Sequence, residues 1–276
     1  MPIKSEQPST CCIQHQSIQI PTSSIRASSI QIPVQQGATE EGDDGDSSQD
    51  VSNVIARANA GIRTRLIHDD IAPNLRRNAV PCTATGCKWP KRGRYVTVPY
   101  TIASHYSTTE RNFIIRTLHS FHQATCIRFQ PRTSHRDYIY FYSGSGCWSY
   151  LGRQGGRQYV SLRRNGCLYT STVQHEVLHA LGFHHEQVRS DRDRYIRILT
   201  QNIQSGMQHN FNKVQTNNLG TPYDFDSVMH YSKYAFSRNG QPTIVARSNP
   251  NLNFGGAKTL SPNDIARVNR LYKCCF

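Results

Sequence analysis

Residues 175–185 read HEVLHALGFHH and carry the strongest structural signal in the chain. His175 and His179 are four positions apart, so on an α-helix both side chains leave the same face, about 6 Å apart in height. Both imidazoles can therefore reach one metal ion. Glu176 follows the first histidine, where its carboxylate can approach a water at that ion without binding the ion itself. The pattern predicts a helix that carries two metal ligands and a base.

The next residues extend the pattern to H-E-x-x-H-x-x-G-x-x-H through Gly182 and His185. A glycine at this point can adopt a positive φ, so the chain can turn sharply and bring His185 back to the helix face. Three neutral histidines with one open position are typical of a catalytic zinc site, with one ion in each chain. The alternative for HExxH alone is an exposed helix face with two histidines. The spacing from Gly182 favours His185 over its neighbour His184, which should point elsewhere.

Around this helix, the pattern of apolar residues predicts an α+β fold. Segments rich in Tyr, Val, Ile and Phe predict strands at 95–102, 126–130, 137–143 and 158–163. Capping boxes predict helices that start at Ser107 with Glu110 and at Ser171 with Gln174, the second ending at Gly182. A further helix should follow Ser261, with Pro262 in its first turn.

The first 77 residues differ in composition from the rest. Residues 1–50 are rich in Ser, Gln, Pro and acidic groups, so we expect them to be disordered. An amphipathic helix is expected from about 51 to 65, then a short extended piece over 66–75. Arg76 and Arg77 offer an exposed basic cleavage site just before Asn78. The predicted division is a propeptide-like region over 1–77 and a catalytic domain over 78–276.

Charge and hydropathy exclude some classes of protein. The net charge is +14, and residues 78–276 hold 25 basic and 9 acidic side chains. No basic helix or aromatic-basic motif of a nucleic-acid binder occurs, so a basic surface that meets acidic protein partners is the preferred interpretation. No segment approaches the ~20 apolar residues of a membrane span. The first residues also lack the pattern of a secretory signal.

Nine cysteines are scattered along the chain and form no C-x-x-C pair. This spacing favours a disulfide framework and an oxidising compartment, although buried free thiols in a cytosolic protein are the alternative.

Longer stretches resemble the astacin family of zinc endopeptidases. These are HEVLHALGFHHEQVRSDRD at 175–193 and SVMHY at 227–231. The likeness covers 78–276 and is greatest to the six-cysteine fish hatching enzymes of the high choriolytic type. It is carried there by NAVPCTATGCKWP, RDYIYFYSGSGCWSY and TNNLGTPYDFDSVMHYSKYAFSRN. The resemblance implies a two-lobed domain with a mixed twisted sheet and helices in the first lobe, and an active-site cleft between the lobes.

The resemblance also implies roles for single residues. Met229 would form the hydrophobic turn beneath the zinc. Tyr231 would bind zinc in the resting enzyme and then stabilise the oxyanion, a packed core tyrosine being the alternative. Asp70 would block the zinc in the zymogen, although Asp69 stands where the motif has glycine, and a solvated acidic pair is the alternative. Glu186 would be linked to the new amino terminus, a link that the disulfide-bearing segment before Trp89 makes doubtful.

The resemblance also implies three disulfides and an edge strand that binds substrate. Cys147, Trp148 and Ser149 would form the upper rim, where substrate pairs in antiparallel fashion; for Trp148, ordinary burial is the alternative. The implied bridges are Cys82–Cys87, Cys126–Cys274 and Cys147–Cys167, which leave Cys275 without a family partner.

The functional expectation is a secreted, monomeric zinc endopeptidase made as a zymogen. Its substrates would be proteins, in particular egg-envelope glycoproteins at hatching. The chain ends at Phe276, so we expect no further modules after the catalytic domain. The alternatives are an astacin protease with another tissue role, or a matrix-binding relative without turnover.

Overall fold

The computed structural model describes residues 50–62, 66–73 and 87–275. The expected disorder over 1–50 and the cleavage site at Arg77 therefore lie outside the described residues, apart from Asp50. The described chain has two hydrophobic cores: a larger one around the main sheet, which defines the first lobe and also takes in Met229 and Val268, and a smaller one formed by residues after α3, which defines the second lobe. The α+β prediction is confirmed.

The main sheet is mixed and follows the order β1-β6-β7-β5-β3-β2, with β4 also paired to β3. Neighbours run parallel except for the β2–β3 and β6–β7 pairs. The four predicted strands are confirmed, with ends that differ by about one residue. The strands are β1 Ile71–Ala72, β2 Lys91–Arg92, β3 Tyr95–Ile102, β4 Ile127–Pro131, β5 Tyr138–Tyr142, β6 Cys147–Tyr150 and β7 Arg157–Leu162.

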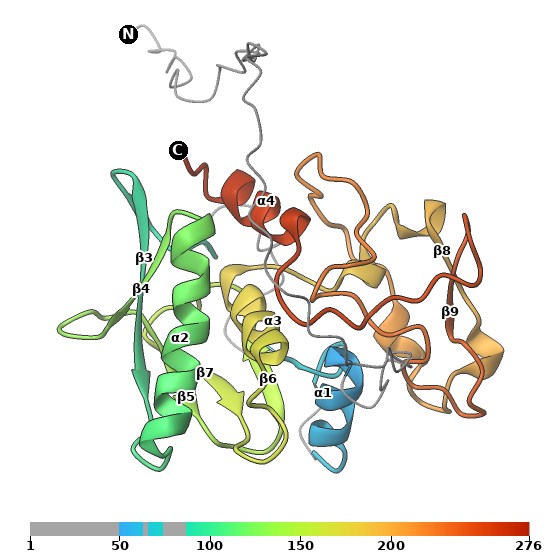
Figure 1. The fold of residues 1–276 in the computed structure, drawn as a ribbon, viewed down its shortest axis with the longest axis horizontal. Coiled ribbons are helices and arrows are strands. Elements are labelled where there is room, and N and C mark those ends of the chain that lie inside the picture. The colour runs from blue at the N-terminus through green and yellow to red at the C-terminus, as the bar shows by residue number, and fades with distance from the viewer. Residues whose placement is uncertain (1–49, 63–65, 74–86, 276) are drawn as a thin grey trace, which may run out of the picture. The chain divides into compact units, whose positions relative to one another are not determined.

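Two helices cover one face of this sheet, α2 (Thr108–Ala124) and α3 (Thr170–Leu181), as Figure 1 shows. Apolar side chains that alternate along the strands meet the apolar stripes of both helices, which removes them from water. Fully buried members of this core are Ile114, Leu118, Phe121, Ile139, Phe141, Val160, Leu162, Val173, Val177 and Leu181.

The predicted helix starts have different outcomes. Ser107 and Glu110 form both hydrogen bonds of a capping box at α2, and Ser261 with Asp264 does the same at α4 (Pro262–Leu271). The capping box predicted at Ser171 is wrong, because the N-cap of α3 is Tyr169, two residues earlier, and no side chain caps this helix. Its presumed partner Gln174 instead binds groups distant in sequence, donating to Ser120 Oγ and accepting from the Leu260 N–H.

The amino-terminal helix, α1, spans Val51–Asn59 and ends earlier than the predicted residue 65. Its apolar stripe, with Val51, Ile55 and Ala58, packs into the main core. None of the described helices has the length and apolar character needed to cross a membrane.

The second lobe has little regular structure. It contains the short antiparallel pair β8 (Ile196–Ile198) and β9 (Ile244–Ala246) and several single turns of 3-10 helix. Disulfides join Cys126 to Cys274 and Cys147 to Cys167. The proposed partner of Cys87, Cys82, lies outside the described residues.

Candidate metal centre

The three predicted histidines converge because α3 ends where the glycine allows it. His175 and His179 project from one face of this helix. Gly182 has a φ of 108°, and its N–H and that of Phe183 donate to the last carbonyls of the helix. This left-handed turn reverses the chain and brings His185 to the same point. His184 lies outside the cluster, with its ring 6.1 Å from that of His68.

The histidine nitrogens are placed to accept a cation. The Nε2 atom of His175 lies 3.1 Å from that of His179 and 3.2 Å from that of His185. The Nδ1 atoms of His175 and His179 face the carbonyl oxygens of Val228 and Phe183, both at 2.7 Å. A carbonyl only accepts, so these Nδ1 atoms carry the protons and the Nε2 atoms present lone pairs. Lone pairs that face each other in a buried site fit a metal ion between them.

The cluster has the dimensions of a zinc site. Ligands at 2.0–2.1 Å around a tetrahedral zinc are about 3.3 Å from one another. The nitrogen spacings are close to this value, and all four side chains, those of Asp70 and the three histidines, are buried. The donor set, with imidazole nitrogens and one carboxylate, is also one that zinc prefers.

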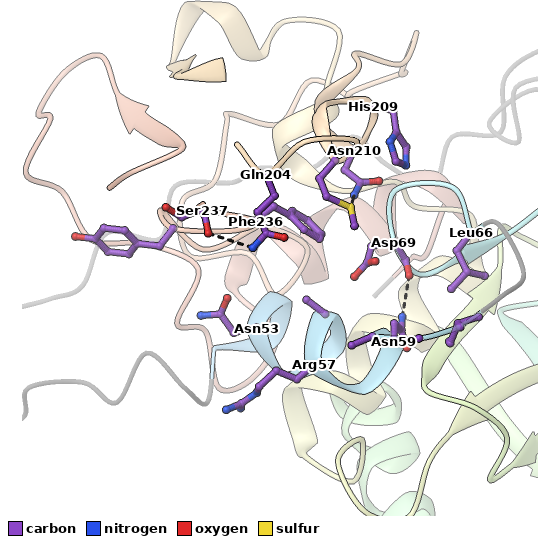
Figure 2. A pocket seen from close by; sticks show the side chains of 16 residues that line it. Asn53, Arg57, Asn59, Leu66, Asp69, Gln204, His209, Asn210, Phe236 and Ser237 are labelled. Atoms are coloured by element: carbon purple, nitrogen blue, oxygen red, sulfur yellow. Dashed lines mark hydrogen bonds between the residues drawn. The ribbon is translucent and has the colours of Figure 1, made fainter. Parts of the chain in front are cut away.

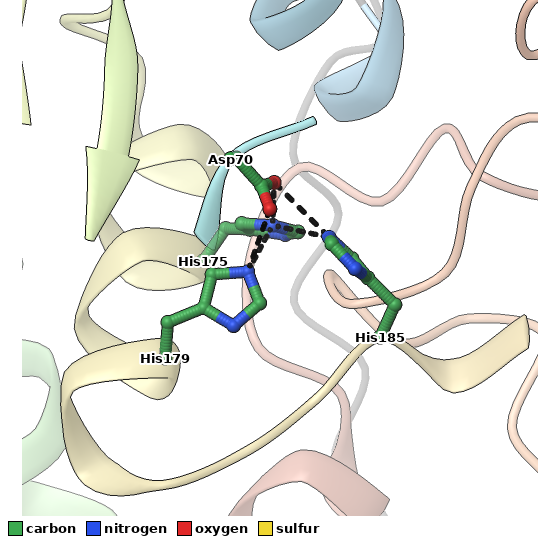
Figure 3. A group of neighbouring side chains, drawn as sticks. All are labelled: Asp70, His175, His179 and His185. Carbon is green, nitrogen blue, oxygen red and sulfur yellow. Dashed lines mark hydrogen bonds and ion pairs between the residues drawn. The ribbon is translucent and has the colours of Figure 1, made fainter. Parts of the chain in front are cut away.

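Asp70 supplies the fourth ligand atom, as Figure 3 shows. One carboxylate oxygen lies 2.9 Å from His175 Nε2 and 3.0 Å from His185 Nε2, and the other lies 3.3 Å from His179 Nε2. A tight turn presents it, closed by two hydrogen bonds between Ile67 and Ile71. In this turn Asp69 has a φ of 71°, a conformation that glycine adopts more readily than aspartate. Aspartate thus occupies the expected glycine position with the glycine-like backbone.

Glu176 lies beside the ligands and is fully buried. Within the described part of the chain, neither of its carboxylate oxygens has a hydrogen-bond partner. Burial, and then the nearby carboxylates of Asp70 and Asp69, raise the pKa of Glu176 well above its usual value. This carboxylate is therefore available to a molecule that enters the site.

The segment after Ser227 supports the ligands from the other side. Met229 is buried in the main core, and its carbonyl accepts from the Glu186 N–H at 2.9 Å. Tyr231 packs its ring 4.7 Å from that of His185. Its hydroxyl donates to the His68 carbonyl at 2.7 Å. In this structure Tyr231 is thus bound to the segment that carries Asp70, and not to the ligand cluster.

The predicted rim residues lie on β6, but β6 is not an edge strand here. β1 pairs with it in parallel, Ile71 opposite Ser149, and the Ser149 N–H donates to the Asp70 carbonyl at 3.0 Å. Because β1 covers this edge, β6 is not an edge strand in this form of the protein, and the rim role of Cys147, Trp148 and Ser149 stays a prediction. Trp148 is half-buried and donates to the Ser145 carbonyl.

Asn59, the last residue of α1, extends this cover and was not singled out by the sequence. Its side-chain amide donates to the Cys147 carbonyl and accepts from the Cys147 N–H, both at 2.8 Å. The same amide donates to the Asp69 carbonyl at 2.8 Å. It therefore satisfies the strand backbone at Cys147 as a paired strand would.

The carboxyl-terminal part of α1 also borders a cavity of about 730 Å³, shown in Figure 2, which is lined by Asn59 and Asp69 together with Gln204, Met207 and Phe236 of the second lobe. The hydrogen bond from Asn59 to the Asp69 carbonyl lies at the wall of this cavity.

Glu186 has partners within the chain. Its carboxylate accepts from Arg267 and Arg189 and from the Asp224 N–H. Burial raises the pKa of Glu186, although both guanidiniums oppose the shift. The implied new amino terminus, at Asn78, lies outside the described residues.

Comparison with known proteins identifies the family. The profile of the peptidase family Astacin matches residues 84–273. The chain belongs to the astacin family. It is therefore a zinc-dependent metalloendopeptidase by family, and the three histidines form a group that could hold the ion.

The relatives include choriolytic enzymes of the fish Oryzias latipes. High choriolytic enzyme 1 is 44% identical over 233 residues, which are 84% of this chain and 86% of that protein. Low choriolytic enzyme is 41% identical over 241 residues, 86% of this chain and 89% of that protein. The solved structure of High choriolytic enzyme 1, a hatching enzyme zinc-protease, matches with a TM-score of 0.68 and 47% identity. The match covers 71% of this chain and 100% of the solved one.

Proposed function

We propose that this chain is the latent, secreted precursor of an astacin endopeptidase that cleaves egg-envelope glycoproteins. The observation that carries the latency is Asp70, whose carboxylate lies among the three histidines. The substrate class is supported by the relatives named choriolytic enzymes, which match most of the chain. The two disulfides support an extracellular location, and we propose a monomer.

In the active form, we assign zinc to His175, His179 and His185. Bound zinc supplies a Lewis acid that polarises the scissile carbonyl and makes a water nucleophilic near neutral pH. Glu176 takes the proton of the attacking water and passes it to the leaving amine, so it acts as base and then as acid. Tyr231, once free of the His68 carbonyl, donates to the oxyanion that develops on the substrate.

Three contacts made by residues 66–73, which we call the first segment, support latency. Asp70 occupies the position of the fourth ligand, and β1 occupies the edge of β6. This strand runs parallel to β6, opposite to the direction expected for a substrate. The peptide bonds of the segment are therefore reversed with respect to Glu176, which protects the segment from cleavage. The third contact is the hydrogen bond that holds Tyr231 to His68.

Activation would remove these contacts together. We propose cleavage after Arg77, which divides the chain into a propeptide over 1–77 and a catalytic domain over 78–276. Asp70, His68 and the two residues of β1, which make these contacts, belong to the part released, as does Asn59, which extends the cover of β6. The structural match to a solved hatching enzyme, which leaves part of this chain without a counterpart, is consistent with this division.

Asn59→Ala should give the uncleaved chain measurable peptidase activity. The substitution removes three hydrogen bonds, each worth about 0.5–1.5 kcal/mol net, so the open fraction should rise by at least about tenfold. Hydrolysis of a quenched peptide by the full chain measures this, with mass spectrometry to show that the chain stays intact. Arg57→Ala, on the same helix but exposed, is the control. An Asn59→Ala chain as silent as the parent would show that Asn59 is not part of the block.

The substrate proposal is tested with the activated full chain on isolated fish egg envelope and on casein, with and without a chelator. We expect soluble fragments from the envelope, and we expect the chelator to prevent their release. Cleavage of casein without cleavage of envelope would instead favour an astacin with another tissue role. Binding to envelope without cleavage of either protein would favour the matrix-binding relative.

A further inference from the structure

The face of the main sheet opposite α2 and α3 is covered by aromatic side chains. Along β5 and β6, buried residues alternate with half-buried ones, and β7 continues the alternation up to Val160, after which Ser161 is buried as well. The buried set faces the two helices, so the half-buried set lies on the other face. We call this set the aromatic face, and it consists of Tyr138, Tyr140, Tyr142, Trp148, Tyr150 and Tyr159.

The rings of the aromatic face pack against one another. The ring of Tyr142 lies 6.1 Å from that of Tyr140, 5.4 Å from Tyr159 and 6.0 Å from Trp148. Trp148 continues the series to Tyr150 at 5.9 Å. Rings fixed in this way lose little conformational entropy when a ligand covers them, which is why tyrosine and tryptophan are frequent at binding hot spots.

The aromatic face also carries positive charge. The Arg157 guanidinium lies 5.1 Å from the ring centre of Tyr159, and that of Arg132 lies 4.2 Å from that of Tyr138. A stacked guanidinium keeps N–H groups at its edge, where they can bind a carboxylate.

The face offers these arginines no acidic partner of its own. No residue of β5, β6 or β7 is acidic. The adjacent Asp137 is already engaged by Arg153 at 2.6 Å and by the Gly156 N–H at 2.7 Å. The described chain shows no ion pair for Arg157, which is exposed.

We infer that the aromatic face is a docking surface for acidic, extended segments of the protein substrate, outside the cleft. The positive charge of the face fits acidic side chains of this partner, and its aromatic rings fit apolar side chains of the same partner. Its position supports the same partner, because Trp148 and Tyr150 belong to β6, the strand along which a substrate would run. The identity of the partner as substrate rests on the proposed function, but the binding itself does not.

Because Arg157, Tyr159 and the tyrosines of β5 lie on strands with which β1 does not pair, the uncleaved full chain should already bind. The probe is immobilised dephosphorylated casein, and the protein is the full chain with Glu176→Gln, so that the probe is not cut. Interferometry should show binding that weakens with salt. Adding Arg157→Glu should raise the Kd by about tenfold or more, and Tyr159→Ser should raise it too.

The matched control is Arg116→Glu, an exposed arginine on α2, which covers the opposite face of the sheet. It should leave the Kd within about twofold, with thermal melting to show that each variant is folded. The inference fails if the parent does not bind, if Arg157→Glu binds as the parent does, or if Arg116→Glu weakens binding equally. Binding that depends on Arg157, together with no peptidase activity of the activated chain that keeps Glu176, would refute the proposed function alone.

Discussion

Glu176→Gln should abolish peptide hydrolysis while the chain keeps its zinc. Glutamine has the shape of glutamate but cannot take the proton of the attacking water, so kcat/KM should fall by about 10³-fold or more. Because Glu176 is beside the ligands and is not one of them, the metal content should not change. The measurement is hydrolysis of a quenched peptide by the activated chain, with zinc determined by mass spectrometry.

Tyr231→Phe is the comparison for this experiment. The loss of one oxyanion donor costs about 10²- to 10³-fold in kcat, and the ring should still pack against His185. Near-normal turnover by Glu176→Gln would remove Glu176 from the mechanism. Loss of zinc from either variant would show that its role is to build the site and not to act in it.

Asp70→Asn should give an uncleaved chain that hydrolyses peptides. Its carboxylate lies 2.9 Å and 3.0 Å from two of the histidines, and no other residue of the described first segment belongs to the ligand cluster. A neutral amide is a weaker zinc ligand than a carboxylate, so substrate should displace the segment more readily. We expect activity at least about tenfold above that of the parent, which corresponds to about 1.4 kcal/mol.

Asp69→Asn is the matched control, because Asp69 is adjacent, is also an aspartate and lies outside the ligand cluster. It should stay latent. If Asp70→Asn is equally latent, the strand cover of β1 and Asn59 is sufficient without the carboxylate. If both variants are active, the turn as a whole, and not the Asp70 ligand, maintains latency.

The sequence predicted the parts of this site that depend on local spacing. The four-residue interval of His175 and His179, and a glycine that permits a left-handed turn, define positions within one helix and its end. Ser107 and Glu110 predicted a cap for the same reason. At Ser171 the same local rule failed, because the presumed partner Gln174 bonds to Ser120 and Leu260, distant in sequence.

Contacts between distant segments could not be predicted from the residues alone. Asn59 and Cys147 are 88 positions apart, and nothing local marks an asparagine at a helix end as a partner for a strand. β1 has only two residues, too few for a periodic signal. Asp70 was found only through a resemblance, since a pair of aspartates by itself is typical of a solvated turn.

Zinc stoichiometry tests the central claim most directly. The full chain, purified without added metal and then titrated with zinc, should bind one ion tightly, and His179→Ala should lose most of that affinity. A folded parent chain that contains no zinc and acquires none in the titration would contradict the account.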